Sequence, residues 1–372
     1  MGLDSDTVSG FMVNPSTYGL IRSNPMSIQA PISTAPTQPQ QGWFAQILRH
    51  RGVQLTLVLW ILGHGIIILL SNGALPFDRP AFAEIPFPLQ ILAPSVMMLE
   101  IFVLMGLGYM LTRNRPSIDL AARAPERSQA MRETLGLVAY AAFGQALGWV
   151  LGPMLGFQPL SFHLAGTLVG GHSGLSVAEV WVWAIYNFGF YAVVPYLWFR
   201  RRYSAVQLNL VSSNRRNDLL VIAVIAISES LFELTTLGTS LNRLSFGQLA
   251  LGLPLSLFIY GIGTVLPTMI LIYSILIPRF LKITGSAITT VLLGGLSYAI
   301  VHIAEGWTNF STPTNALLSI LFVLINYFGA GMIKTVLTLR TGNAWVHALG
   351  YHTIAPHVII DTPHIVNIFG IR

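Results

Sequence analysis

The chain has 372 residues, of which 53% are hydrophobic and only 9% are charged, and its formal net charge is +6. Ordinary soluble domains carry roughly 25% charged residues. Together with many apolar runs of about 18 residues or more, this composition indicates an all-α protein whose helices cross a membrane several times. The absence of cysteine excludes disulfides, thiolate nucleophiles and cysteine-ligated zinc. The positive charges are spread over loops, which argues against nucleic acid as a partner.

The first segment, residues 1–44, is polar and rich in Ser, Pro, Thr and Gln, as in the stretch 33–41. It has no basic start followed by an apolar core, so we do not interpret it as a secretory signal. Its composition favours a disordered or loosely docked tail.

Nine apolar spans follow the tail, which predicts a polytopic transmembrane helical bundle surrounded by the lipid bilayer. Their expected positions are 53–71, 89–111, 135–157, 177–198, 219–237, 248–276, 286–304, 316–333 and 343–360. The sixth span contains Pro254, Gly261, Gly263 and Pro267. Proline removes a backbone hydrogen bond and glycine lets a helix bend, so we expect this span to be tilted, kinked or broken.

Arginine and lysine are concentrated in alternate connections between the spans. They precede span one and follow spans two, four, six and eight, as at Arg51, Arg115, Arg201, Lys282 and Lys334. The intervening loops contain only Arg79 and Arg243. By the positive-inside rule, the N-terminus is expected in the cytoplasm and the C-terminus outside.

Several ionisable residues fall within the predicted spans, where they are costly unless they face a partner, a cavity or a ligand. Tyr298, His302 and Glu305 share one face of a helix at about 100° per residue. Glu229 and Glu233 lie one turn apart in span five, as expected for a general base or for carboxylates that bind a metal ion or an arginine. Glu100 in span two has no such neighbour, and we interpret it as structural.

The last span contains His347, His352 and His357, each five residues from the next. Residues five apart on a straight α-helix are about 140° apart, so the three side chains are not expected on one face. His302, Glu305, His352, His357, Glu229 and Glu233 are all chemically suitable zinc ligands, but no compact spacing such as HExxH joins them. From the sequence we expect no stoichiometric transition metal and no cofactor-binding residues.

Three short motifs resemble those of the CPBP family, which comprises intramembrane CAAX-prenyl endopeptidases and bacteriocin-processing or self-immunity proteins. Tyr298-Ala-Ile-Val-His302 resembles its aromatic-x-x-x-His motif, and 277–286 resembles the connection into that helix. Thr341-Gly-Asn-Ala-Trp345 followed by His352 resembles the closing motif, in which a His precedes an Asn or Asp by four. The resemblance covers about residues 200–360, which implies a CPBP-like core at 201–372 and accessory helices at 45–200.

The chain also departs from the family pattern. The family's first motif, EExxxR, normally stands where this chain has the acid-free stretch 267–273, and only Ser228-Glu229-Ser-Leu-Phe-Glu233 echoes it. Pro356 stands four residues after His352. In the family, a Glu and the first His are thought to activate water, and the second His and the Asn to stabilise the oxyanion. The resemblance therefore implies His302 and His352 as catalytic residues, with Glu229 or Glu233 as the replacement carboxylate.

Three functions stay open at this point. The first is an intramembrane endopeptidase that acts on a membrane-embedded or prenylated peptide. The second is a catalytically inactive relative that serves as a scaffold, as an immunity protein or as a subunit of a complex with other membrane proteins. The third is a proton-coupled transporter that uses Glu229, Glu233 and His302 as a relay, which a broken span six would suit.

Overall fold

The computed structural model describes residues 43–77, 86–164, 174–236 and 238–372, and these residues form helices and loops without strands. Trp43–Arg372 form one compact unit. The all-helical fold predicted from the sequence is confirmed. The predicted polar tail, 1–44, lies outside the described residues except at its end, where the short helix α1 (Trp43–Arg49) begins.

Seven helical segments among the described residues are long and apolar enough to cross a membrane, which supports an integral membrane protein. They are α2 (Arg51–Leu70), α3 (Phe87–Thr112), α4 (Arg127–Met154), the segment Val177–Arg200, α7 (Arg215–Thr236), the segment Phe246–Thr284 and α12 (Pro313–Thr341). Short 3-10 helices, η2 (Ala121–Arg123) and η4 (Gly238–Arg243), lie in the connections.

The other two predicted spans have a different form, so the count of nine is not confirmed. In place of 286–304 there is α11 (Ala287–Ile300), whose 14 residues extend about 21 Å at 1.5 Å per residue, less than the ~30 Å hydrocarbon core. In place of 343–360 there is a series of short helical segments. They are α13 (Ala344–His347), η7 (Ala348–His352) and η8 (Ile354–Ile359), followed by α14 (Thr362–Ile368).

The sixth predicted span is continuous but irregular. It runs for 39 residues through α8 (Phe246–Tyr260), η5 (Gly261–Val265), α9 (Leu266–Thr268), η6 (Met269–Leu276) and α10 (Ile277–Thr284). Both η5 and η6 are π-helical turns, which lead into α9 and α10, where a proline stands near the start of each helix. The fourth span has the same design, with π-helical η3 (Phe188–Val193) between α5 (Val177–Asn187) and α6 (Val194–Arg200).

Capping residues mark where α11 and α12 begin and where α10 and α12 end. Ser286 and Thr312 each accept a hydrogen bond from a backbone N–H in the first turn of the following helix. Gly285 and Gly342 adopt left-handed backbone angles (φ 64° and 61°) where α10 and α12 end, a conformation that glycine adopts without strain.

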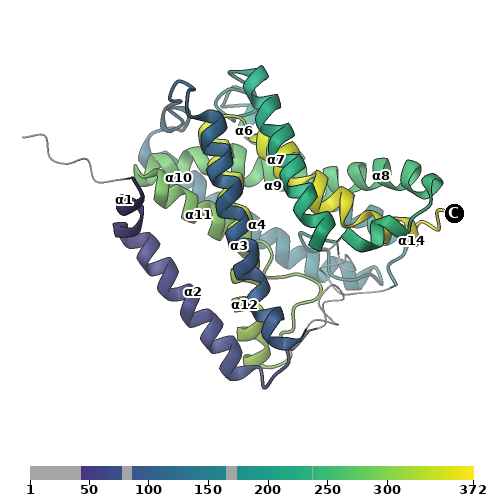
Figure 1. Cartoon of the computed structure of the whole chain (residues 1–372). Helices are drawn as coiled ribbons and strands as arrows, with labels where there is room; N and C mark the ends of the chain where they lie inside the picture. Colours follow the sequence, from purple (N-terminus) through teal and green to yellow (C-terminus); the bar gives the residue numbers. More distant parts are fainter. Residues whose placement is uncertain (1–42, 78–85, 165–173, 237) are drawn as a thin grey trace, which may run out of the picture. The chain divides into compact units, whose positions relative to one another are not determined.

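The centre of the bundle is the pair α11 and α12, which pack along each other, and α12 also packs against α3 (Figure 1). The contact between α11 and α12 is made through glycines. A Cβ atom built on Gly331 would lie 2.6 Å from Cβ of Tyr298 and 2.8 Å from Cα of Gly295. Small residues of this kind let helix backbones approach closely in membranes.

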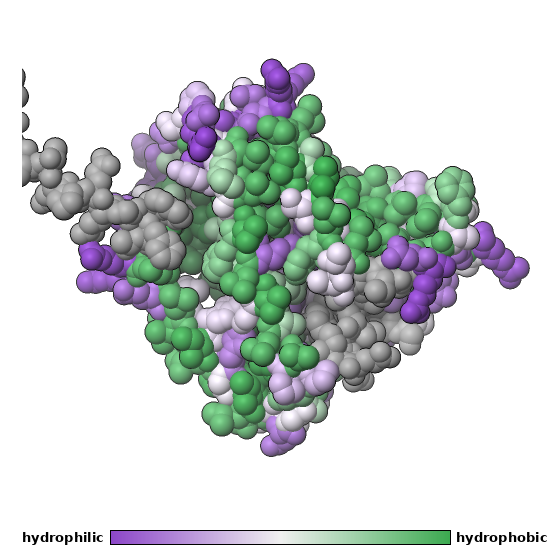
Figure 2. All heavy atoms as spheres, viewed as in Figure 1, coloured by the Kyte–Doolittle hydropathy of each residue, from purple (hydrophilic) through white to green (hydrophobic). Residues whose placement is uncertain are grey.

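The outer surface of the visible face is apolar over its middle, and polar residues gather at its upper end, where α7 begins (Figure 2). Leu59 and Leu69 of α2 and Val103 of α3 are among the exposed large hydrophobic side chains. An apolar surface of this kind would be unfavourable in water, so it is the surface expected to contact lipid acyl chains.

Polar contacts join the N-terminal helices to the C-terminal ones. Arg279 of α10 forms a buried ion pair with Glu133 of α4 (2.6 Å). Nε1 of Trp149 in α4 donates to the carbonyl oxygen of Ala304 (2.8 Å). The segments 45–200 and 201–372 therefore pack against each other within one unit, and their predicted roles as accessory helices and catalytic core stay a prediction.

Candidate functional site

Four histidines, two acids and one tyrosine gather in the interior, where α11 ends and the η7–η8 segment passes. They are His163, His302, His352, His357, Glu305, Asp361 and Tyr298. All except His163 have exposed fractions of 4% or less. His163 comes from the loop between α4 and α5, and 13% of its side chain is exposed.

The loop that carries His163 is held in place by buried hydrogen bonds. Nε1 of Trp183 donates to the carbonyl oxygen of Ser161 (2.8 Å). The amide of Asn187 donates to the carbonyl oxygens of Ser161 and Phe162, and also to that of Gly263 in η5. Trp183 and Asn187 belong to α5, and they bind carbonyl groups both in this loop and in η5. The residues just before His163 are therefore fixed to the helix core.

Tyr298 links the two histidines of the predicted motifs. Nδ1 of His302 lies 2.6 Å from the carbonyl oxygen of Tyr298, one helical turn earlier. The hydroxyl of the same tyrosine lies 3.1 Å from Nε2 of His352. The sequence motifs that contain His302 and His352 are therefore brought together at one residue, His302 at its backbone carbonyl and His352 at its side-chain hydroxyl.

His163 stands between His302 and Glu305. Its Nε2 atom lies 3.3 Å from Nε2 of His302, and its Nδ1 atom lies 3.4 Å from Oε1 of Glu305. Tyr298, His302 and Glu305 are thus close together, but α11 ends at Ile300, so the predicted common helix face stops before His302. A residue from a distant loop joins His302 and Glu305. The ring of Tyr327 on α12 packs against His302, with centroids 4.1 Å apart.

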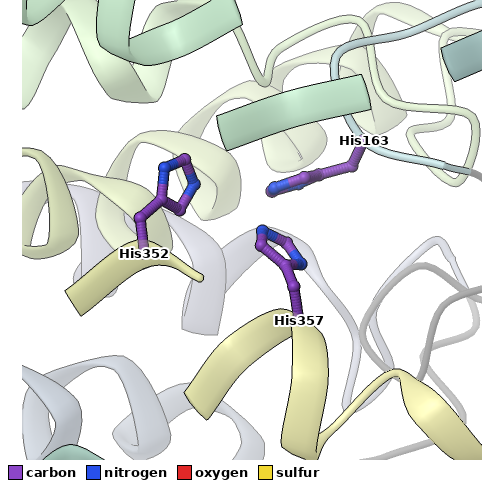
Figure 3. A group of neighbouring side chains, drawn as sticks. All are labelled: His163, His352 and His357. Atoms are coloured by element: carbon purple, nitrogen blue, oxygen red, sulfur yellow. The ribbon is translucent and has the colours of Figure 1, made fainter. Parts of the chain in front are cut away.

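The rings of His352 and His357 lie close together, with centroids 5.3 Å apart, although a straight α-helix would separate them by about 140°. The reason is that η7 and η8 are π-helical. In a π-helix the hydrogen bonds join residues five apart, which brings those residues into neighbouring positions. The expectation that these two rings face apart is therefore wrong. His163 points its ring toward the gap between them (Figure 3).

His357 is held by partners on both sides of its ring. Its Nδ1 atom lies 3.0 Å from Oδ2 of Asp361. The ring stacks on Tyr260 of α8, at a centroid distance of 4.8 Å and an angle of 7°. Its Nε2 atom is buried and has no hydrogen-bond partner among the described residues.

Glu229 and Glu233, the predicted catalytic carboxylates, are buried on the face of α7 that packs against η7 and η8. Neither is hydrogen-bonded to His302, whose partners are Tyr298 and His163. Lys334 is close enough to Glu229 for an attractive charge interaction. Their catalytic role stays a prediction. Glu100 of α3 is also largely buried, and its Oε1 atom has no hydrogen-bond partner among the described residues.

Lys334 was predicted to mark a cytoplasmic loop, but it lies inside α12 and is 1% exposed. Its Nζ atom lies 3.4 Å from the centre of the Tyr298 ring, so it borders the histidine cluster. The predicted end of this span near 333 led to the error, because α12 continues to Thr341. A cavity of about 540 Å³ lies elsewhere, lined by residues such as Arg132, Glu133 and Arg202, and none of the clustered histidines lines it.

Comparisons with known proteins do not identify the chain, because no family model, no curated protein and no solved structure matches it. The site is therefore interpreted from its own geometry and from the short motifs described above.

Proposed function

We propose that the protein is an intramembrane endopeptidase of CPBP type that hydrolyses a membrane-embedded or prenylated peptide. The observation that carries this proposal is the 3.1 Å contact between the Tyr298 hydroxyl and Nε2 of His352, because Tyr298 belongs to the same motif as His302 and its carbonyl oxygen lies 2.6 Å from Nδ1 of His302. Two motifs about 50 residues apart, which resemble the two histidine motifs of that family, therefore meet in one buried place, as a shared reaction centre requires.

The cluster offers a base and a carboxylate for activating water. A carbonyl oxygen can only accept a hydrogen bond, so Nδ1 of His302 carries the proton and its Nε2 atom is left as an acceptor. Nε2 can take a proton from water, and the positive charge that results is stabilised by Glu305 through the intervening His163. Such an arrangement of base and orienting carboxylate is typical of hydrolytic sites. The Tyr298 hydroxyl, which lies 3.1 Å from Nε2 of His352, is a group that can donate to the carbonyl oxygen of a peptide.

The experiment that tests this proposal is cleavage of a prenylated CAAX peptide and of a transmembrane reporter by the purified protein. We expect cleavage by the wild type and none by His302→Ala, because the proton acceptor is removed. Glu100→Gln should remain active, since Glu100 lies on α3 and outside the cluster. Cleavage that persists in His302→Ala would contradict the assignment of this site.

A catalytically inactive scaffold is the second candidate, and the burial of the cluster favours it, because His302 is 0% exposed. A substrate can reach this residue only if the surrounding helices separate. Absence of wild-type cleavage for both substrates, with the protein correctly folded, would select the scaffold.

We further propose a topology with the N-terminus in the cytoplasm, the C-terminus outside and α11 and the α13–η8 segment counted as spans. In support, α3 and α12 run in the same direction, because Nε of Arg340 near the end of α12 donates to Thr112 at the end of α3 (3.0 Å). The loop after α3 and the loop before α12 therefore lie at opposite ends of this helix pair. The proposed nine spans require the same relation between spans two and eight.

Single cysteines test this topology without background, because the chain has none of its own. Ser117 and Ser311 are both exposed in these two loops. In intact cells or sealed vesicles, Ser117→Cys should react with a membrane-impermeant maleimide only from the cytoplasmic side, and Ser311→Cys only from outside. Modification of both from the same side would contradict the proposed arrangement.

A further inference from the structure

Four of the buried histidines share a feature that hydrolysis by itself does not require. Each has its Nδ1 atom next to a fixed protein acceptor. These acceptors are the Tyr298 carbonyl for His302, Glu305 for His163, Asp361 for His357 and the Thr268 hydroxyl for His352. The Thr268 hydroxyl hydrogen is directed at the carbonyl oxygen of Thr264, so its oxygen is the acceptor toward His352.

Protons on the four Nδ1 atoms leave the four Nε2 atoms of neutral rings with lone pairs. Nε2 of His163 lies 3.3 Å from Nε2 of His302, a contact that is a hydrogen bond when either atom carries a proton. Nε2 of His357 is buried without a hydrogen-bond partner among the described residues, and an uncompensated buried acceptor is unfavourable. A cation bound by His357 and its neighbouring histidines would satisfy this atom.

From this geometry we infer that the protein binds one divalent transition metal ion of the zinc type, with His163, His352 and His357 as its three ligands. One ligand atom from each of these residues lies within 4.8 Å of the others, and the three rings converge from two chain segments (Figure 3). Two nitrogens bound tetrahedrally to zinc at 2.0–2.1 Å are about 3.3–3.4 Å apart, so the rings move together only slightly on binding.

The surroundings of the three ligands match a metal site in a second respect. A histidine that binds a metal ion almost always donates its other ring N–H to a carboxylate, a backbone carbonyl or a similar acceptor. Asp361 fills this role for His357 and Thr268 fills it for His352. Glu305 lies 3.4 Å from Nδ1 of His163, where its charge is close to that ring. These partners orient the rings and supply two carboxylates close to the positive ion.

His302 lies beside this ion and outside the three-ligand set. It groups with His163 and Glu305, and not with His352 and His357. Three nitrogen ligands leave a fourth position for water, as in catalytic zinc sites. The expectation of no stoichiometric metal rested on the lack of a compact motif and on the angles of a straight α-helix, and the π-helical turns remove the second argument. The inference goes beyond peptide hydrolysis, because metal binding can be present in a scaffold as well.

Metal content of the purified full-length protein in detergent or nanodiscs tests the inference directly. After loading with Zn²⁺ or Co²⁺ and removal of excess ion, elemental analysis should give about one metal ion per chain. His352→Ala and His357→Ala should lose it, whereas His64→Ala should retain it, because His64 lies on α2 and bonds to Ser95 instead. His302→Ala should also retain it. Wild-type protein without bound metal, or retention by His357→Ala, would overturn the inference.

A milder variant keeps the test independent of folding. Asp361→Asn preserves the size of the side chain but weakens the acceptor for His357, and loss of such a partner typically lowers metal affinity 10–100-fold. Competition with a chelator of known affinity should show this decrease, and Glu100→Gln should show none. An unchanged affinity in Asp361→Asn would contradict the assignment of His357. Because no peptide is needed, this result is distinct from success or failure of the cleavage assay.

Discussion

Glu305→Gln is expected to lower the rate of peptide cleavage by up to about 10²–10⁴, the usual contribution of a positioned base, because the base His302 depends on the charge of Glu305. The substitution keeps the shape of the side chain but removes the negative charge 3.4 Å from His163. Without that charge, the proton that His302 takes from water leaves an uncompensated cation in the interior. Initial rates with the prenylated peptide, measured on wild type and variant at equal folded concentration, provide the comparison.

Glu229→Gln is the variant to compare with Glu305→Gln, because the sequence motif predicts Glu229 as the supporting carboxylate and the geometry favours Glu305. If Glu305 supports the base, Glu229→Gln should cleave at a rate close to that of the wild type. The reverse pattern, with Glu229→Gln inactive and Glu305→Gln active, would identify Glu229 on α7 as the carboxylate that supports the base. Thermal unfolding of both proteins separates a loss of chemistry from a loss of structure.

Gly331→Leu is expected to prevent normal folding. A side chain at this position meets the Cα of Gly295 and the carbonyl oxygen of Gly294 within 2.9 Å of its first carbon, and backbone atoms of a packed helix have no room to give. Separation of α11 from α12 would also displace Tyr298, which holds His302 and His352. Overpacking in ordinary cores costs about 1–3 kcal/mol, and we expect at least that loss here.

Gly106→Leu is the matched control, since a Cβ atom on Gly106 of α3 meets nothing within 4 Å. Size-exclusion profiles in detergent and thermal unfolding should show a normal protein for Gly106→Leu and an aggregated or destabilised one for Gly331→Leu. Equal behaviour of the two would show that α11 and α12 are not packed as described.

Helical periodicity predicted only part of the site. Tyr298, His302 and Glu305 were expected on one helix face, but α11 ends at Ile300, and the turn that follows keeps the three residues close together, with His163 between the last two. The relation of His352 to His357 was missed because single-sequence patterns do not reveal π-helical turns. The only available signal was their spacing of five residues, which has opposite meanings in the two kinds of helix.

His163 was missed for a different reason. It lies in a loop, near no recognisable motif, and hydrogen bonds such as those of Trp183 and Asn187 fix the neighbouring chain next to the core. Contacts between residues far apart in the chain produce no periodic pattern in the sequence from which they could be predicted. The apolar spans were predictable because membrane length sets them directly, but α11 shows that an apolar run does not fix the length of the helix that it forms.

The charges of α7 and α12 have a consequence for how the protein enters the membrane during synthesis. Glu229 and Glu233 make α7 a poor substrate for insertion, because a charged residue near the middle of a span costs about 2.5–3.5 kcal/mol on biological insertion scales. The basic residue that attracts Glu229 is Lys334, which is synthesised more than 100 residues later. This interaction can form only after α12 has been synthesised, so we expect the two helices to leave the insertion machinery together.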